Sequence, residues 1–89
     1  MVTGNARYTY RPDVLAALLR HGVCPTSQTP PELVRAFVRD LYKYEIRMLR
    51  ERYMRREFPK KEYAGLVEQL RRRYAVLSLL PQQLIEERP

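Results

Sequence analysis

Apolar residues recur at intervals of three and four along most of the chain, and this spacing predicts α-helices. No alternating stretch of useful length and no internal repeat is present. The predicted fold class is therefore all-α, a small three-helix bundle built on a long antiparallel helical hairpin. The expected organisation is an N-terminal arm over 1–11, a bundle over 12–80 with helices at about 12–21, 30–57 and 59–77, and a C-terminal tail over 81–89 that is irregular or forms a short helix.

Prolines, glycines and capping residues set the predicted helix ends. Pro12 suits the first turn of a helix, and Gly22 suits the position just after one. Thr29 and Glu32 fit a capping box, in which each side chain bonds to the backbone of the other residue. The helix that they open meets no further breaker until Pro59, so we expect it to end shortly before that residue.

Two apolar seams with the same spacing of four, three and four predict how the long helices pair. The seams are Tyr42, Ile46, Leu49 and Tyr53 on the second helix, and Tyr63, Val67, Leu70 and Tyr74 on the third. In antiparallel order each pair is centred on position 58, so a turn at Phe58-Pro59 brings all four pairs together. A further apolar face of the second helix is expected to receive the first helix, with Leu84 and Ile85 as a further candidate cover. That face consists of Val34, Phe37, Val38, Leu41, Tyr44 and Met48.

The charge of the chain is concentrated in its central part. The chain has 89 residues, 45% of them hydrophobic and 30% charged, which suits one folded domain. Seventeen Lys and Arg against ten Asp and Glu give a net charge of +7, and residues 35–73 alone hold thirteen basic and six acidic residues. The whole excess therefore lies on the central stretch, where it favours an anionic partner.

The basic stripe, a row of five cations on the second helix, is the main candidate binding site. Its members are spaced by four, four, four and three, which places them on one face of the helix. Like charges four residues apart destabilise an isolated helix by about 0.2–0.5 kcal/mol per pair. A row of one sign therefore indicates an anionic partner, with a simple solvated face as the alternative. The stripe is Arg35, Arg39, Lys43, Arg47 and Arg50, and the hairpin tip adds the candidate partner-binding residues Arg55, Arg56, Lys60 and Lys61.

Tyr53, Met54 and Phe58 lie between the cations of the tip. Basic groups mixed with aromatic rings are typical of surfaces that hold phosphates and stack on unpaired bases. The alternative is that Tyr53 packs in the seam and Phe58 packs across the turn. The seam register favours this second interpretation for Tyr53.

Several kinds of chemistry are not expected. The single Cys24 cannot form an internal disulfide and fits a reducing compartment, and with the single His21 it cannot build a zinc site within one chain. A Cys–His nucleophile would need a third orienting group, and none is evident nearby. Gly4, Gly22 and Gly65 are isolated, so no phosphate-binding loop is present. We therefore expect a protein that is not an enzyme and has no catalytic residue, metal or cofactor.

Membrane and helix-turn-helix functions are not expected either. The longest apolar run, residues 14–19, has six residues, against the roughly 20 that a membrane-spanning helix needs. No signal peptide is expected, so we expect a cytoplasmic protein. A helix-turn-helix needs a short turn and a short recognition helix, which the loop over 22–28 and the long helix after it do not supply.

Two classes of function remain. The first is a non-catalytic helical adaptor or assembly module that docks on an acidic surface of a larger partner protein through the basic face of the hairpin. The alternative is binding of RNA, with DNA less favoured, through the same stripe and tip. The protein partner is preferred because Arg and Tyr are over-represented at interface hot spots, and because no RNA-binding module signature is present. A homodimer through the face predicted to receive the first helix is a variant of the first class.

Overall fold

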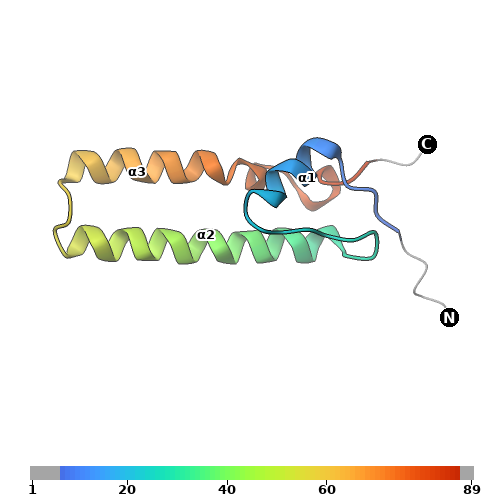
Figure 1. The fold of residues 1–89 in the computed structure, drawn as a ribbon, viewed down its shortest axis with the longest axis horizontal. Coiled ribbons are helices and arrows are strands. Elements are labelled where there is room, and N and C mark those ends of the chain that lie inside the picture. Colours follow the sequence, from blue (N-terminus) through green and yellow to red (C-terminus); the bar gives the residue numbers. More distant parts are fainter. Residues whose placement is uncertain (1–6, 87–89) are drawn as a thin grey trace.

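The computed structural model describes residues 7–86 and has an all-α fold, as predicted. Two long helices form an antiparallel hairpin, and a short helix packs against the base of that hairpin, the end opposite the turn that joins them (Figure 1). The molecule is elongated, with principal extents of 55 × 24 × 18 Å. Its elements are α1 (Pro12–Leu19), α2 (Pro31–Met54), α3 (Lys60–Arg73) and the 3-10 helices η2 (Ala75–Ser78) and η3 (Pro81–Gln83).

The contacts between α2 and α3 agree with the predicted register. At the tip, the rings of Tyr53 and Tyr63 stack with centroids 4.3 Å apart. Towards the base, the rings of Tyr42 and Tyr74 lie 5.2 Å apart. These two contacts confirm the outermost pairs of the predicted seam. Between them, Leu49 and Leu70 are buried, and Ile46 and Val67 pack against the same core.

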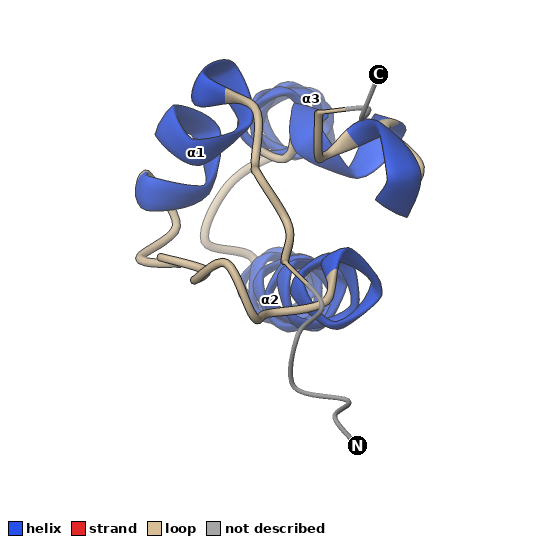
Figure 2. Ribbon diagram, turned by 90° about the vertical axis from the view of Figure 1, so that its right-hand side faces the viewer, coloured by secondary structure: helices blue, strands red, loops and turns tan. Residues whose placement is uncertain are grey.

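The densest part of the core lies at the base, where α1 meets the hairpin. Seen end-on, α1, α2 and α3 stand at the corners of a triangle (Figure 2). Val14 and Leu18 of α1 are buried together with Val34 and Val38 of α2. Complete burial of a side chain of this size contributes about 1.5–3 kcal/mol. These contacts therefore anchor the short helix, which has too few residues to be stable alone.

The arm and the tail meet at the base and close the core. Tyr10 and Ile85 form an isolated antiparallel bridge. The backbone N–H of Arg11 donates to the carbonyl of Leu84 at 3.1 Å, and that of Glu86 donates to the carbonyl of Thr9 at 2.7 Å. Leu84 is only 1% exposed, so the structure places part of the tail inside the bundle. In place of the short helix considered for the tail, there is the single 3-10 turn η3. Residues 1–6 of the arm and 87–89 of the tail lie outside the described residues.

The predicted capping box at Thr29 and Glu32 is wrong. The N-cap of α2 is Pro30, and no side chain caps the helix. The Thr29 hydroxyl instead accepts a hydrogen bond from the backbone N–H of Thr26 at 3.0 Å and stabilises the preceding loop. The physical reason is that Pro31, the first helical residue, has no N–H to be satisfied, and Thr29 lies one position too early to reach the next donors.

All three helices end earlier than predicted, and left-handed residues close the first two. After α1, Gly22 has φ +75°, and the N–H of Val23 donates to the carbonyl of Leu18 at 3.0 Å. After α2, Arg56 has φ +63°, and the N–H of Glu57 donates to the carbonyl of Arg52 at 3.1 Å. Both are Schellman-type ends. The predicted ends at 21, 57 and 77 therefore move to Leu19, Met54 and Arg73, with α3 continuing as the 3-10 helix η2.

Candidate functional site

The basic stripe divides into exposed cations and one structural arginine. Lys43, Arg47 and Arg50 are exposed, and no carboxylate among residues 7–86 forms an ion pair with them. Arg39 lies 3.9 Å from Asp40, and both side chains are at least half exposed. Arg35 is different, because its guanidinium is half-buried and donates from Nε to the carbonyl of Leu79 and from Nη2 to that of Leu77, both at 2.8 Å. Arg35 therefore holds the segment after α3 against α2.

The hairpin tip contains an ion-pair network centred on Glu57. Glu57 accepts hydrogen bonds from Nε of Arg52 at 2.9 Å and from Nε of Arg55 at 3.3 Å. These bonds, that from Arg52 foremost, hold the pKa of the exposed Glu57 carboxyl below its usual range. The Arg52 guanidinium also lies 5.2 Å from the centre of the Phe58 ring, a cation–π distance. Part of the positive charge of the tip is therefore already neutralised.

The other tip cations remain exposed. Arg56, Lys60 and Lys61 have no ion pair with any carboxylate in the described part of the chain. They lie around the turn rather than on one face, since Arg56 is in the left-handed turn position and the two lysines begin α3. The tip thus adds diffuse positive charge beyond the end of the basic stripe.

The aromatic rings of the tip are packed against one another. The ring of Tyr53 stacks on that of Tyr63 and lies 6.5 Å from that of Phe58, in a nearly parallel orientation. Phe58 is 8% exposed. The interpretation that puts Tyr53 in the seam is therefore confirmed, and Phe58 packs across the turn. Only Met54, at 67% exposure, projects into solvent.

The apolar strip is a line of exposed side chains along α2. The face predicted to receive the first helix is buried at Val34 and Val38 and half-buried at Leu41, while Phe37, Tyr44 and Met48 stay exposed. The reason is length: α1 has eight residues, about 12 Å, whereas α2 has 24 residues, about 36 Å. The strip consists of Leu33 (61% exposed), Phe37 (52%), Tyr44 (58%) and Met48 (36%).

Leu33 belongs to none of the faces that the sequence analysis identified. Leu33 lies four residues before Phe37, a spacing that places both side chains on the same face of a helix. This spacing was the signal from which its place on the face could have been found.

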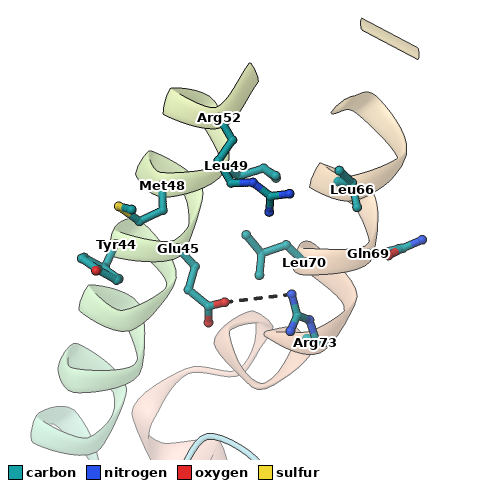
Figure 3. Close-up of a pocket in the computed structure, with 9 residues that line it drawn as sticks. All are labelled: Tyr44, Glu45, Met48, Leu49, Arg52, Leu66, Gln69, Leu70 and Arg73. Atoms are coloured by element: carbon teal, nitrogen blue, oxygen red, sulfur yellow. Dashed lines mark ion pairs between the residues drawn. The ribbon is translucent and has the colours of Figure 1, made fainter. Parts of the chain in front are cut away.

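A groove runs between α2 and α3 on the part of the hairpin that α1 does not cover (Figure 3). It encloses about 280 Å³, with Leu49, Leu66 and Leu70 as its apolar lining. Tyr44 and Met48 of the apolar strip also line it, so the strip and the groove form one continuous surface. The sequence pattern alone does not indicate this groove, because its lining combines residues of both long helices.

A polar cluster separates the groove from α1. Glu45 of α2 and Arg73 of α3 approach within 4.0 Å across the hairpin (Figure 3). The Tyr74 hydroxyl donates a hydrogen bond to the Glu45 carboxylate, and the His21 ring stacks on Tyr74 with centroids 4.1 Å apart. Burial and the bond to Glu45 raise the pKa of Tyr74 to about 12. The cluster joins the C-terminal end of α1 to both long helices.

His21 and Cys24, the pair considered for nucleophilic chemistry, have different surroundings: His21 is hydrogen-bonded and Cys24 is exposed. Nε2 of His21 lies 2.8 Å from the carbonyl oxygen of Arg73, a hydrogen bond that engages one of its two ring nitrogens. Cys24 is exposed in the loop after α1 and forms no disulfide. Between residues 7 and 86, no three His, Cys, Asp or Glu side chains gather in a way that could hold a metal ion.

The comparisons provide no relative from which a function could be transferred. None of the protein-family models, curated proteins or solved structures matches this chain. In the described part of the chain, no helix combines the length and the apolar character needed to cross a membrane. The function must therefore be argued from the surface itself.

Proposed function

We propose that the protein is a non-catalytic helical adaptor whose hairpin docks on an acidic surface of a larger partner protein. The observation that carries this proposal is that the exposed apolar strip and the basic stripe lie on α2 and adjoin each other at Arg47. At about 100° per residue, Arg47 lies about 60° around the helix from Tyr44. A single partner surface can therefore contact cations and apolar side chains together.

The apolar strip and the basic stripe contribute to binding in different ways. Phe37 and Tyr44 are more than half exposed, and burying side chains of this size on docking is worth about 1.5–3 kcal/mol each before the costs of association. Lys43, Arg47 and Arg50 have no carboxylate partner among the described residues that would have to be displaced. They attract and orient an acidic partner, which affects the association rate and specificity more than the affinity.

RNA binding through the same stripe is supported less well. Sequence-tolerant binding of unpaired RNA uses exposed aromatic rings on which bases stack. Tyr53 and Phe58, the rings among the tip cations, pack against each other and against Tyr63 instead. The exposed aromatic residues, Phe37 and Tyr44, lie along α2 in line with leucine and methionine, a composition that favours a protein surface.

The test asks whether the protein captures a partner protein from a nuclease-treated extract of the source cells. It also asks whether this capture depends on the basic stripe. The test variant is Arg39→Glu combined with Arg47→Glu, both exposed positions of the stripe. The matched control is Arg71→Glu combined with Gln28→Glu and Gln82→Glu, three exposed positions outside the stripe and the groove, which changes the net charge by the same amount. We expect the wild-type protein and the control to retain the same partner protein at near-physiological salt, and the stripe variant to lose it.

Melting temperatures measured on all three proteins separate binding from folding. Substitutions at exposed positions change stability by about 0.5 kcal/mol or less, so the three temperatures should be similar. Equal capture by the stripe variant and the wild type would refute the proposal, and so would capture that disappears on nuclease treatment.

A further inference from the structure

The groove between α2 and α3 is the place where the bundle lacks a third helix. α1 occupies the base of the hairpin, and Glu45 and Arg73 line both the groove and the hollow beside Arg20 and His21 at the C-terminal end of α1. The groove therefore continues the path of α1 towards the tip. On the α2 side it extends from Tyr44 to Arg52, about 12 Å, which matches the length of α1 itself.

The lining of the groove fits the apolar stripe of a helix. Leu49 and Leu70 are 8% and 2% exposed, and they form a floor that is already rigid because it belongs to the core. Tyr44 and Met48 stand at one edge, where Met48 can adapt its shape to a partner. In three-helix packing, a helix placed here would bury one apolar stripe and leave its other faces exposed.

The charge around the groove decides what kind of helix fits. Four arginines line the groove and its continuation beside α1, namely Arg52 and Arg73 with Arg20 and Arg72. The only carboxylate in these two linings is that of Glu45. A helix with acidic residues on either side of its apolar stripe is complementary to this rim. A second copy of the chain would instead oppose arginine to arginine.

We propose that the groove binds a single acidic amphipathic α-helix of the partner, which lies in line with α1 and completes the third position of the bundle. This inference rests on the proposed adaptor function and names the partner element that the hairpin recognises. The apolar stripe of the partner helix packs on Leu49, Leu66 and Leu70. Its carboxylates face the rim arginines, of which Arg52 and Arg73 already pair with Glu57 and Glu45, whereas Arg20 and Arg72 have no ion pair with a described carboxylate.

The test uses a designed probe rather than the partner. The probe is a fluorescein-labelled synthetic helix of about 18 residues with leucine on one face and glutamate on both sides of it. The control probe carries lysine in place of every glutamate. The protein variants are Met48→Glu, which puts a like charge at the edge of the groove, and Met54→Glu, the same substitution at the 67% exposed tip position.

We expect the glutamate probe to bind the wild type and Met54→Glu with similar affinity, and Met48→Glu at least about tenfold more weakly. The lysine probe should not bind at the same concentrations. In an NMR titration, backbone amide shifts should be concentrated at residues 44–52 and 66–73. Failure of the glutamate probe to bind the wild type below about 100 µM would overturn the inference, as would equal binding by both probes or by both variants.

Two further outcomes separate this inference from the proposed function. If Met48→Glu still captures the partner from extract while the stripe variant does not, the adaptor function stands and the groove is not the docking site. If the wild type forms a dimer in sedimentation that Met48→Glu abolishes, a second copy occupies the groove and the inference is overturned.

Discussion

At the scale of single residues, the hairpin turn contains one avoidable strain. Arg56 has φ +63°, a left-handed conformation that costs a residue with a side chain about 1–2 kcal/mol. Its guanidinium forms no ion pair with any residue of the described chain that would compensate. The position corresponds to Gly22 after α1, where the same type of helix end is closed by glycine.

We therefore expect Arg56→Gly to stabilise the protein by about 0.5–1 kcal/mol, since glycine relieves the strain but gains freedom in the unfolded chain. In a domain of this size the melting temperature should rise by about 2–8 °C. Arg55→Gly is the control, because Arg55 has φ −81° and bonds to Glu57, so it should lower the melting temperature. A fall with Arg56→Gly would contradict the account of the turn.

Two buried tyrosines make the stability depend on alkaline pH. Burial foremost raises the pKa of Tyr10 and of Tyr74 to about 12 each, from the ordinary tyrosine value of about 10. The unfolded chain therefore releases these protons at lower pH than the folded chain. The stabilisation is complete below about pH 10 and is lost as the pH rises towards about 12.

The measurement is an absorbance titration at the phenolate band, combined with chemical denaturation at several pH values. We expect Tyr10 and Tyr74 to ionise well above pH 10, together with unfolding. Ionisation of these two tyrosines near pH 10 in a folded protein would contradict their burial.

At the scale of elements, the tail holds the base of the bundle together. Leu84 is 1% exposed and contacts the core that α1 and α2 share, whereas Leu80, four residues earlier, is 53% exposed. Leu84→Ala should lower the free energy of unfolding by about 2–5 kcal/mol, through lost burial and the cavity that remains. Leu80→Ala should change it by about 0.5 kcal/mol or less. Denaturant titration measures both, and equal effects would mean that the tail does not belong to the core.

The hairpin could be predicted from sequence because the apolar spacing that specifies it is periodic and lies within two neighbouring segments. Two seams with the same spacing on either side of Phe58-Pro59 define a single register, and the ring contacts Tyr53–Tyr63 and Tyr42–Tyr74 match it. The ends of the helices were less predictable. Nothing in the local pattern distinguishes Arg56 as left-handed, since the backbone bonds of the turn impose that conformation.

The base and the candidate site depend on contacts between distant segments, which local patterns do not encode. The pairing of Tyr10 with Ile85 joins residues 75 positions apart in the sequence, and only the assembled fold brings them together. The basic stripe was predictable as a row of cations, but the role of Arg35 was not, because its partners are the carbonyls of Leu77 and Leu79. The exposed strip and groove follow from how little of the hairpin α1 covers.

At the scale of the whole molecule, the protein is a hairpin with one half covered by α1 and the other half open. The covered half holds α1, the arm and the tail, and it contains most of the buried side chains. The open half carries Arg47 and Arg50 of the basic stripe, part of the apolar strip and the groove. The stripe itself begins at the covered base, where Arg35 bonds to the segment after α3. Charge reversal at Arg39 and Arg47 is expected to abolish binding and leave folding intact, because both side chains are exposed.

The most direct test of the account compares two ligands under one condition. The wild-type protein is titrated at about 150 mM salt with the glutamate helix probe and, in parallel, with a mixed pool of RNA oligonucleotides. We predict measurable binding of the acidic helix and at most marginal binding of the RNA. Tight RNA binding that falls steeply with the logarithm of salt concentration, together with no binding of the acidic helix, would contradict the account and assign the basic stripe to phosphate contacts.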